Sequence, residues 1–338
     1  MDEQTLAAYL DRISAPRPAV LDAAALRILH RAHQLAVPFE NLSIHLPEPI
    51  SLAEPDLLDK IVTRRRGGFC YELNGAFALL LEALGAEVAL VSARVQGTAE
   101  LSPPFDHLAL VVRLTDGSGL WLADVGFGSH SDYPLQLENR EEQADPAGRF
   151  LLADAEYGDL DVFRDGKLQY RIERRGRSLA DFVPTCWWQQ TSPESHFTHS
   201  TICSRLTGEG RISISGRTLI RTTGGVRSEE ELPDDDALLA AYRDHFGVVL
   251  DRVPAVRTPL FRVPRDCPAG GRGRTAPRRW RRGRWPHRRR PPPHRAGRAC
   301  AAGPRGSRDT GDSRPGRAGR PAQERGLAPV PRRRRRGG

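Results

Sequence analysis

Hydrophobic residues recur with the period of an α-helix through the first 90 positions of the chain. Near the start, one helical face would collect Leu6, Tyr9, Leu10 and Ile13. The same period continues over 19–37 until Pro38 interrupts it. Residues 51–66 predict another short helix, with Ser51 as its N-cap. The N-terminal part is therefore expected to be helical.

A further helix is predicted to begin at Cys70, directly after the Gly67-Gly68 pair. Its buried face would be made by Leu73, Phe77, Leu80, Leu81 and Leu84. Gly85 would end it, because glycine readily adopts the left-handed conformation that often follows a helix. A cysteine thus stands between two glycines and a helix start, which raises the question of what its thiol does.

From residue 88 the hydrophobic period changes to two, which is typical of β-strands. Such stretches, separated by Asp-Gly and Gly turns, cover 87–95, 107–128, 149–174 and 211–225. They predict a sheet or a small barrel, followed by an amphipathic helix near 235–246. After about Val263 the chain is mainly Arg, Pro, Gly and Ala. This tail is expected to be disordered, because burial of so few apolar residues cannot offset the entropy lost on folding.

Charge is divided unevenly along the 338 residues, which are long enough for one large domain or two to three small ones. The whole chain has a net charge of +9. Residues 265–338 contain 24 arginines, no lysine and four acidic residues, so this segment carries +20 and residues 1–264 carry −11. An acidic body is therefore joined to a basic tail.

Cysteine usage and hydropathy indicate the cellular compartment in which the protein is expected. The five cysteines, at positions 70, 186, 203, 267 and 300, are an odd number without close spacing, which argues against a disulfide framework or a CxxC metal site. The first 13 residues are acidic and amphipathic, unlike a secretory signal. The longest apolar runs are far shorter than the roughly 20 residues of a membrane span. We expect a reduced, cytoplasmic protein without a membrane partner.

Cys70 is the first candidate for chemistry. A thiol is a nucleophile only as its thiolate, and the pKa of a free cysteine is near 8.5. The N-terminal end of a helix favours an anion. Gly67 and Gly68 would let backbone approach closely, or leave N–H groups free to hold an oxyanion. A histidine base with a carboxylate behind it would complete the arrangement.

A predicted hairpin offers that histidine and carboxylate. If Asp116-Gly117 forms a two-residue turn, paired positions sum to 233. His107 then lies opposite Gly126, and Asp124 is two residues away on the same face. The Cα atoms of His107 and Asp124 would be about 7–8 Å apart or less. A four-residue loop keeps this parity, whereas a three-residue loop would put the two side chains on opposite faces.

Taken singly, each of these residues has an ordinary interpretation. A lone buried cysteine is more often a small core residue than a nucleophile. A lone strand histidine is usually a satisfied surface or core group, and an aspartate before a glycine-containing loop is usually a turn former. Only the joint occurrence of Cys70, His107 and Asp124 favours a catalytic set.

Five blocks of sequence, in this order, resemble the arylamine N-acetyltransferase family. They are PFENLSIHL (38–46), RGGFCYELN (66–74), FDHLALVV (105–112), WLADVGFG (121–128) and SPESHFTHSTIC (192–203). The resemblance covers the chain from residue 1 to about 260. It implies a Cys-His-Asp triad in which Cys70 accepts the acyl group, His107 is the base and Asp124 orients the base.

The resemblance also implies substrate contacts. The residues that would shape the acceptor pocket are Phe39, Phe127 and Phe197. Core packing is an equal alternative for the first and the last of these. The residues that would contact CoA are Gly126, Gly128 and Ser129. The segment 220–229, with Arg221 and Arg227, is a further candidate for CoA, against the alternative of a plain hairpin turn. Glu40 and Asn41 would brace Arg66.

The implied fold is α+β, with a core like that of cysteine proteases and transglutaminases. A helical N-terminal domain over 1–88 would carry the cysteine at the start of its last helix. A central β-barrel over 89–190 would carry the histidine and the aspartate. A C-terminal α/β lid over 191–263 and a disordered Arg/Pro/Gly-rich tail over 264–338 would follow.

The implied function is an acetyl-CoA-dependent N-acetyltransferase of xenobiotic metabolism. It would move an acetyl group through a cysteine thioester to arylamines or hydrazines by a ping-pong mechanism, with acetyl-CoA as co-substrate and no metal. Three alternatives stay open: a macrolactam-forming amide synthase of the same family, a thiol hydrolase or transglutaminase with the same triad, and a nucleic-acid-binding protein led by its tail. The natural acceptor and the oligomeric state, including a homo-oligomer, also stay open.

The tail itself has three interpretations. It could bind nucleic acid or anionic surfaces through its charge, be a solvated linker, or be an out-of-frame readthrough of GC-rich DNA. We favour the last, because a basic arm selected for binding would usually contain lysine and this one has none. Nucleic-acid binding by the tail is therefore not expected.

Overall fold

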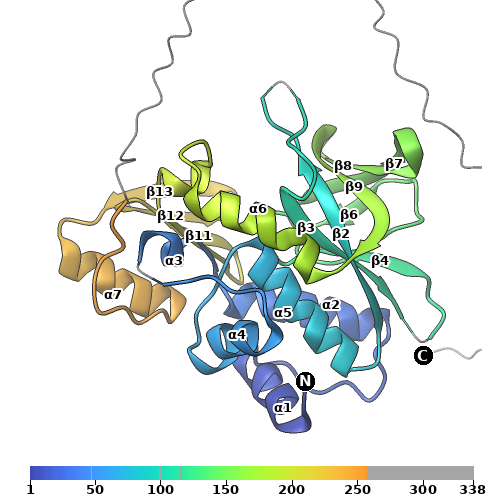
Figure 1. Ribbon diagram of the computed structural model, residues 1–338, viewed down its shortest axis with the longest axis horizontal. Coiled ribbons are helices and arrows are strands. Elements are labelled where there is room, and N and C mark those ends of the chain that lie inside the picture. The colour runs from blue at the N-terminus through green and yellow to red at the C-terminus, as the bar shows by residue number, and fades with distance from the viewer. Residues whose placement is uncertain (47, 99, 115, 257–338) are drawn as a thin grey trace, which may run out of the picture. The chain divides into compact units, whose positions relative to one another are not determined.

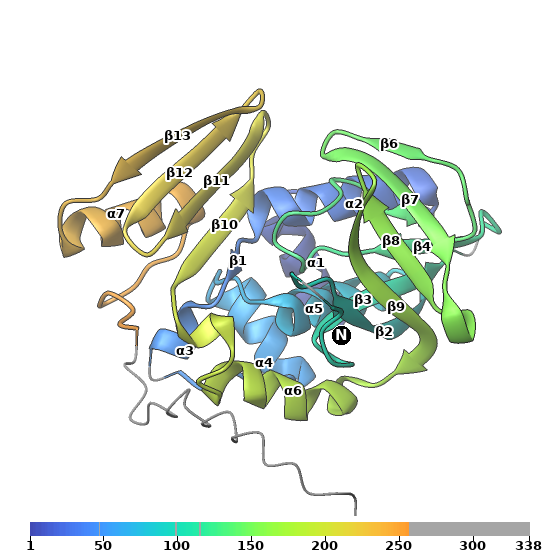
Figure 2. The ribbon, with the colours of Figure 1, turned by 90° about the horizontal axis from the view of Figure 1, so that it is seen from above.

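Two antiparallel sheets and a set of helices make up the part of the chain that this computed structural model describes, residues 1–46, 48–98, 100–114 and 116–256 (Figure 1). The α-helices are α1 (Glu3–Arg12), α2 (Ala23–Ala36), α3 (Leu42–His45), α4 (Glu54–Leu58), α5 (Cys70–Ala83), α6 (Leu179–Thr191) and α7 (Asp235–Phe246). A π-helical turn covers Asp59–Thr63, and 3-10 turns cover Glu156–Gly158 and His196–Thr198. Seen from above, the two sheets lie to either side of the central helices (Figure 2).

The larger sheet has eight strands. In spatial order they are β5 (Leu135–Gln136), β4 (Leu120–Ala123), β3 (His107–Arg113), β2 (Glu87–Val95), β9 (Lys167–Arg177), β8 (Leu160–Arg164), β7 (Gly148–Asp154) and β6 (Gln143–Asp145). The smaller sheet has the order β1 (Phe39–Glu40), β10 (Ile202–Leu206), β11 (Gly210–Ser215), β12 (Thr218–Thr223) and β13 (Val226–Glu231).

Side chains bridge the two edge strands of the larger sheet, β5 and β6. The Gln136 N–H donates to Gln143 Oε1 over 2.8 Å, and Gln143 Nε2 donates to the Gln136 carbonyl over 3.0 Å. The Asp145 carboxylate accepts the N–H groups of Asp132 and Tyr133 at 2.9 and 3.1 Å. The sheet therefore nearly closes on itself, which confirms the prediction of a sheet or small barrel.

The N-terminal helices form where the hydrophobic period predicts them. The predicted face of α1 is buried. The first turns of α1 and α2 are capped by Asp2 and Asp22, whose carboxylates accept N–H groups at 2.8 Å. The next helix differs from the prediction. It starts after Ala53, and Ser51 accepts the Ala53 N–H over 3.2 Å in the preceding turn, so Ser51 is not the N-cap.

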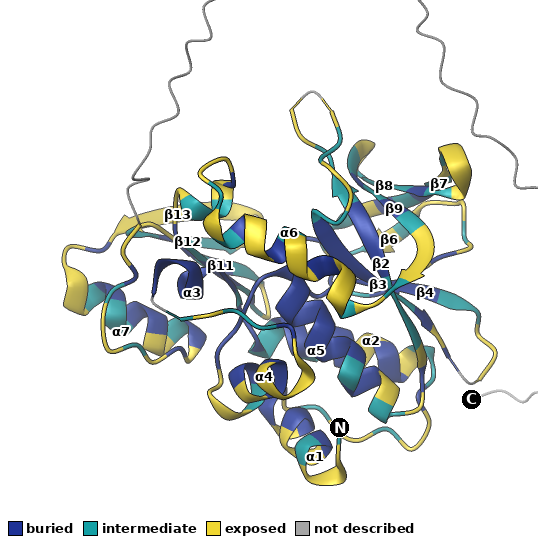
Figure 3. Cartoon of the chain, viewed as in Figure 1, coloured by how far each residue is buried: buried dark blue, intermediate teal, exposed yellow. Residues whose placement is uncertain are grey.

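Helix α5 forms the centre of the fold. Most of its side chains are buried on every side, as expected for a helix that is apolar around most of its circumference (Figure 3). It packs against β2 and β3 on one side and against α1, α4 and α6 on others. Gly85 follows it with a φ of 96°, as the glycine stop predicts. Cys70 therefore begins a helix that is packed on nearly all sides.

Helix α6 was not predicted, because it lies in the stretch 89–190 that was expected to be β. Pro184 stands inside the helix and removes one backbone donor. Val183 and Trp187 are apolar yet exposed, which blurs the helical pattern. The helix nevertheless forms because Phe182 and Cys186 are buried in the main core. The domain boundaries themselves stay a prediction.

Strands β10 to β13 of the smaller sheet and α7 form the C-terminal part of the described chain. Asp234 caps α7 by accepting the Ala237 N–H over 2.8 Å, and Gly247 ends it with a φ of 68°. The helix predicted near 235–246 is thus confirmed. The predicted disordered tail, 264–338, lies outside the described residues. Among the described helices, none has both the length and the apolar composition needed to cross a membrane.

Candidate active site

Cys70 is the first residue of α5, and a buried ion pair fixes that helix start. The extended residue Phe69 precedes it and donates its N–H to Glu72 Oε2 over 3.2 Å. Glu72 Oε1 in turn accepts from Lys60 Nζ over 2.6 Å. The first N–H groups of a helix have no intrahelical acceptor, so the sulfur lies at the positive end of the helix dipole, as predicted.

The glycine pair before Cys70 is required by close packing. A Cβ on Gly67 would lie 1.9 Å from the Pro38 carbonyl oxygen, and one on Gly68 would lie 2.6 Å from Glu72 Oε2. The Gly68 N–H donates to the Pro38 carbonyl over 3.4 Å, and its own carbonyl accepts the Glu40 N–H at 2.8 Å. The predicted close approach is confirmed, whereas the expectation that the Gly68 N–H is free for an oxyanion is wrong.

The register of the β3–β4 hairpin is the predicted one. The pairs run from Leu110 opposite Ala123 to Arg113 opposite Leu120, and each sums to 233. His107 begins β3, and Asp124 directly follows β4. The two side chains therefore emerge at the same end and on the same face of the hairpin.

His107 and Asp124 form a buried pair. His107 Nε2 lies 2.8 Å from Asp124 Oδ2, and both side chains are almost fully buried. Because Nε2 is engaged by the carboxylate, Nδ1 is the ring nitrogen left for the thiol of Cys70, which interacts with the ring. The structure thus brings the three predicted triad residues together in the order Cys70, His107, Asp124.

Electrostatics favour a charged imidazolium at this site. Burial alone would lower the pKa of His107, but the charge and hydrogen bond of Asp124, together with the Cys70 thiol, raise it to about 10. Burial would conversely raise the pKa of Asp124. The His107 charge and the bonds from His107 and Asn74 outweigh that effect and hold the pKa of Asp124 well below its usual range.

Asp124 is held by Gly126 and by two residues that the sequence did not single out, Asn74 and His30. Asn74 Nδ2 donates to Asp124 Oδ1 over 2.9 Å, and the Gly126 N–H donates to the same oxygen over 3.0 Å. His30 Nε2 accepts the Asp124 N–H over 3.1 Å. Asn74 could have been found, because it lies one helical turn after Cys70 on the same face of α5. Nothing in the sequence around His30 distinguishes it.

A pocket of about 420 Å³ opens over the triad, a volume within the usual range of small-molecule sites. Its lining includes Cys70, His107 and the three phenylalanines predicted for the acceptor, Phe39, Phe127 and Phe197. The Phe127 ring meets the His107 ring edge-on at 5.1 Å between centroids. The residues are therefore at the pocket wall; their contact with a substrate stays a prediction.

The three residues expected to contact CoA differ in position. Gly126 lines the pocket, and a Cβ there would lie 2.7 Å from Asn74 Nδ2 and 2.8 Å from the Cα of Cys70. Gly128 has a φ of 88° and faces the ring of Phe39. Ser129 is exposed. Close packing therefore explains why position 126 is a glycine, and CoA contact at all three positions stays a prediction.

We expect Gly126→Ala to lower the activity of this site by at least tenfold and the free energy of unfolding by about 1–3 kcal/mol, because the added methyl group meets the backbone of Cys70. The rate and the thermal midpoint should be measured together. Gly208→Ala is the matched control, since a Cβ there meets nothing within 4 Å and its φ is not positive. A Gly126→Ala protein with full activity would contradict the packing argument.

The expected brace of Arg66 is half right. Glu40 makes a buried ion pair with Arg66, with an N–O distance of 2.9 Å. Asn41 does not contact Arg66. Its Nδ2 donates to the Phe197 and Ser200 carbonyls at 3.0 and 2.8 Å, and it accepts the Ile202 N–H at 2.8 Å. Asn41 therefore fastens the segment that carries Phe197 to the pocket.

The segment 220–229 forms the β12–β13 hairpin, with its turn at Gly224-Gly225. Its two arginines already have partners: Arg221 pairs with Glu230 at 3.0 Å and Arg227 with Glu229 at 2.6 Å. The alternative of a plain hairpin turn thus describes the segment better than a phosphate site does. In the described part of the chain, no cluster of three or more His, Cys, Asp or Glu side chains could hold a metal ion.

Comparisons with known proteins identify the family. A family model described as N-acetyltransferase matches residues 22–255. The arylamine N-acetyltransferase of Escherichia coli is 32% identical over 252 residues, which are 72% of this chain and 88% of that protein. The solved structure of the arylamine N-acetyl transferase of M. smegmatis superposes with a TM-score of 0.67 at 32% identity, covering 73% of this chain and 92% of that one.

One more solved structure bears on the co-substrate. It is the arylamine N-acetyltransferase of Mycobacterium marinum in complex with CoA. It superposes with a TM-score of 0.66 at 31% identity and covers 72% of this chain and 92% of that chain.

Proposed function

Because this chain belongs to the arylamine N-acetyltransferase family and is an acyltransferase, we propose that it carries an acetyl group from acetyl-CoA through Cys70 to an aromatic amine or a hydrazine. The observation that carries this proposal is the buried Cys70–His107–Asp124 arrangement at the floor of an aromatic pocket. The reaction would proceed in two half-reactions, with CoA leaving before the amine enters.

In the first half-reaction the Cys70 thiolate attacks the carbonyl carbon of the acetyl thioester. A new S–C bond forms at Cys70, and the S–C bond to CoA breaks. The leaving CoA thiolate takes a proton from the His107 imidazolium, so free CoA departs and an acetyl-enzyme remains. An imidazolium beside the sulfur supports this step, because it favours the thiolate and supplies the proton.

In the second half-reaction the neutral amine nitrogen attacks the acetyl-enzyme. The N–C bond forms, the bond from carbon to the Cys70 sulfur breaks, and His107 takes the proton that the nitrogen loses. Asp124 holds the imidazole with Nε2 toward itself and Nδ1 toward the sulfur. Exchange between two thioesters is nearly isoenergetic, so a cysteine is a suitable relay for both halves.

The pocket supports an aromatic acceptor. An arylamine is neutral at pH 7, so its reacting nitrogen needs no counter-charge, and its ring gains from contact with Phe39, Phe127 and Phe197. For the donor, support comes from the M. marinum relative, whose solved structure is a complex with CoA. By that likeness acetyl-CoA would be the co-substrate, entering past Gly126 and Gly128.

The test is to mix the purified full-length chain with acetyl-CoA and aniline and to follow free CoA thiol. Thiol release that needs the amine, with acetanilide formed in equal amount, would support acetyl transfer. Release at the same rate without any amine would indicate a thiol hydrolase instead. No release and no acetyl adduct on the protein would overturn the proposal.

The pH dependence of alkylation tests the activated sulfur. The pKa of His107 is raised to about 10, so its imidazolium persists as the pH falls from 10 through neutrality. A positive neighbour favours the thiolate form of a cysteine, so we expect iodoacetamide to alkylate this site below pH 7 faster than it alkylates a free thiol. A rate equal to that of a free thiol, which loses about tenfold per pH unit there, would contradict the ion pair.

A further inference from the structure

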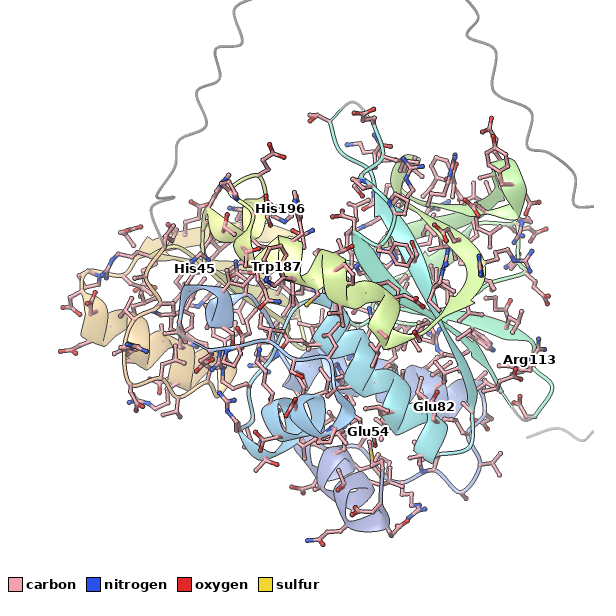
Figure 4. All side chains as sticks on the ribbon, in the orientation of Figure 1. His45, Glu54, Glu82, Arg113, Trp187 and His196 are labelled. Atoms are coloured by element: carbon pink, nitrogen blue, oxygen red, sulfur yellow. The ribbon has the colours of Figure 1, made fainter. Side chains whose placement is uncertain are left out.

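A second pocket, which we call the annex pocket, adjoins the pocket over the triad, here called the reaction pocket. The annex pocket has a volume of about 650 Å³ and shares Val95, Asp106, Gln189 and His196 with the reaction pocket. Pro103, Pro104, Pro184 and Trp188 line the annex pocket alone. Figure 4 shows His196 and Trp187, the neighbour of Trp188, in the region where α6 leads into the following 3-10 turn. The two pockets are thus adjacent along these shared residues, and together they are called the cleft.

Asp106 stands where the two pockets meet, and two hydrogen bonds hold it there, the second of them supported by a bond to Ser195. The hydroxyl of Tyr71 donates to the Asp106 carbonyl over 3.1 Å. Gln189 Nε2 donates to Asp106 Oδ1 over 2.7 Å, and Gln189 Oε1 in turn accepts from the Ser195 hydroxyl over 2.5 Å. These bonds fix the carboxylate next to His107 while they leave Oδ2 available.

Within the described residues, no lysine, arginine or histidine makes an ion pair with the Asp106 carboxylate, although His107 and His196 line the same pocket. The described lining residues of both pockets also include no lysine or arginine. A half-buried carboxylate between apolar walls attracts a cation, because few waters screen it. The same walls are poorly suited to phosphate groups, which need basic partners.

We propose that Asp106 selects acceptors that carry a cationic group beyond their aromatic ring. The ring with its neutral reacting nitrogen would lie among the phenylalanines of the reaction pocket. The distal ammonium group would bind Asp106 Oδ2 at the junction, and any longer substituent would extend along Trp188. The inference rests on the proposed acetyl transfer. CoA leaves before the acceptor enters, so the whole cleft is free for it.

Three para-substituted anilines of similar size test this inference. 4-Aminobenzylamine carries a distal ammonium group at neutral pH, 4-aminobenzyl alcohol is its neutral counterpart, and 4-aminobenzoate is an anion. We expect the kcat/KM of the unsubstituted protein to be about 10- to 100-fold higher for the ammonium compound than for the alcohol, as for a hydrogen bond to a charged group. The anion should be the poorest of the three.

The near-isosteric variant Asp106→Asn tests whether the preference for the cationic amine comes from the charge of Asp106. The ratio of the two kcat/KM values should fall to about 1–2 in Asp106→Asn, since the charge is lost. Because the measured quantity is a ratio within one protein, any general effect on the neighbouring His107 cancels. Asp56→Asn, at an exposed carboxylate of α4, is the control and should keep the ratio of the unsubstituted protein.

The outcomes separate this inference from the proposed function. Acetylation of all three amines without preference for the cation would overturn the inference and leave acetyl transfer standing. A cation preference that survives in Asp106→Asn would also overturn it, because another group would be responsible. No transfer to any amine would overturn both.

Discussion

Replacing Cys70 by alanine should reduce acetyl transfer by about 10⁴-fold or more, because both half-reactions pass through its sulfur. The thermal midpoint should change little. Cys70 is buried, and a typical single substitution lowers the free energy of unfolding by on the order of 1 kcal/mol. In a domain of this size that corresponds to about 2–4 °C. Loss of activity with a retained midpoint is what a nucleophile, unlike a core residue, predicts.

Mass spectrometry of the intact protein makes the test specific. After incubation with acetyl-CoA and no amine, the unsubstituted protein should carry one acetyl group, and Cys70→Ala should carry none. Cys186→Ala is the matched control, since Cys186 is also a buried free thiol but does not line the reaction pocket. It should be acetylated normally. Transfer by Cys70→Ala within tenfold of the unsubstituted protein would rule out the cysteine relay.

Local rules were sufficient for the geometry of the triad. A turn centred on Asp116-Gly117 with an even number of residues fixes the parity of the hairpin, so the register that places His107 and Asp124 on one face follows from sequence, although the observed pairing ends at Arg113 and Leu120. The same is true of the position of Cys70, because the glycine pair before it and Gly85 after it delimit one apolar helix. Where neighbouring residues decide the conformation, the prediction was confirmed.

Contacts between distant segments were beyond such rules. The His30 ring accepts the Asp124 N–H across 94 positions, and no local pattern marks that histidine among its helical neighbours. Asn41 reaches the carbonyls of Phe197 and Ser200 instead of Arg66, for the same reason. The near closure of the barrel depends on Gln136, which is exposed, and Gln143, which is half-buried, and neither stands out in the sequence from ordinary loop residues.

Helix α6 escaped prediction because apolar residues lie on its exposed face as well as on its buried face. Its apolar residues face both the core and the solvent, and Trp188 lines the annex pocket. A helix whose outer face also binds would lack the clean division into polar and apolar sides on which pattern analysis depends. The same helix supplies Gln189, which orients Asp106. The element that the sequence missed is therefore the one on which the specificity proposal depends.

Asp124→Asn should also lower acetyl transfer by about 10³- to 10⁴-fold, although it removes only a charge. Every group that faces the carboxylate is a donor: Oδ2 faces His107, and Oδ1 faces Asn74 and the Gly126 N–H. An amide has one oxygen and one NH₂ group, so its NH₂ faces either the Asn74 and Gly126 donors or His107 Nε2, which must then accept and carry its proton on Nδ1 instead. The first orientation costs about 1–3 kcal/mol of stability for the unsatisfied buried group. The second holds the imidazole in the tautomer that cannot take a proton at Nδ1.

The same variant should also slow the alkylation of Cys70 below neutral pH. Without the carboxylate, burial is free to lower the pKa of His107, so the imidazolium is absent near neutrality and the sulfur loses its counter-ion. The rate of iodoacetamide alkylation should then fall toward that of a free thiol. Asp132→Asn is the control, because Asp132 is also a buried carboxylate but pairs with Arg31 and not with His107. Unchanged alkylation below pH 7 in Asp124→Asn would show that something other than this carboxylate keeps His107 charged.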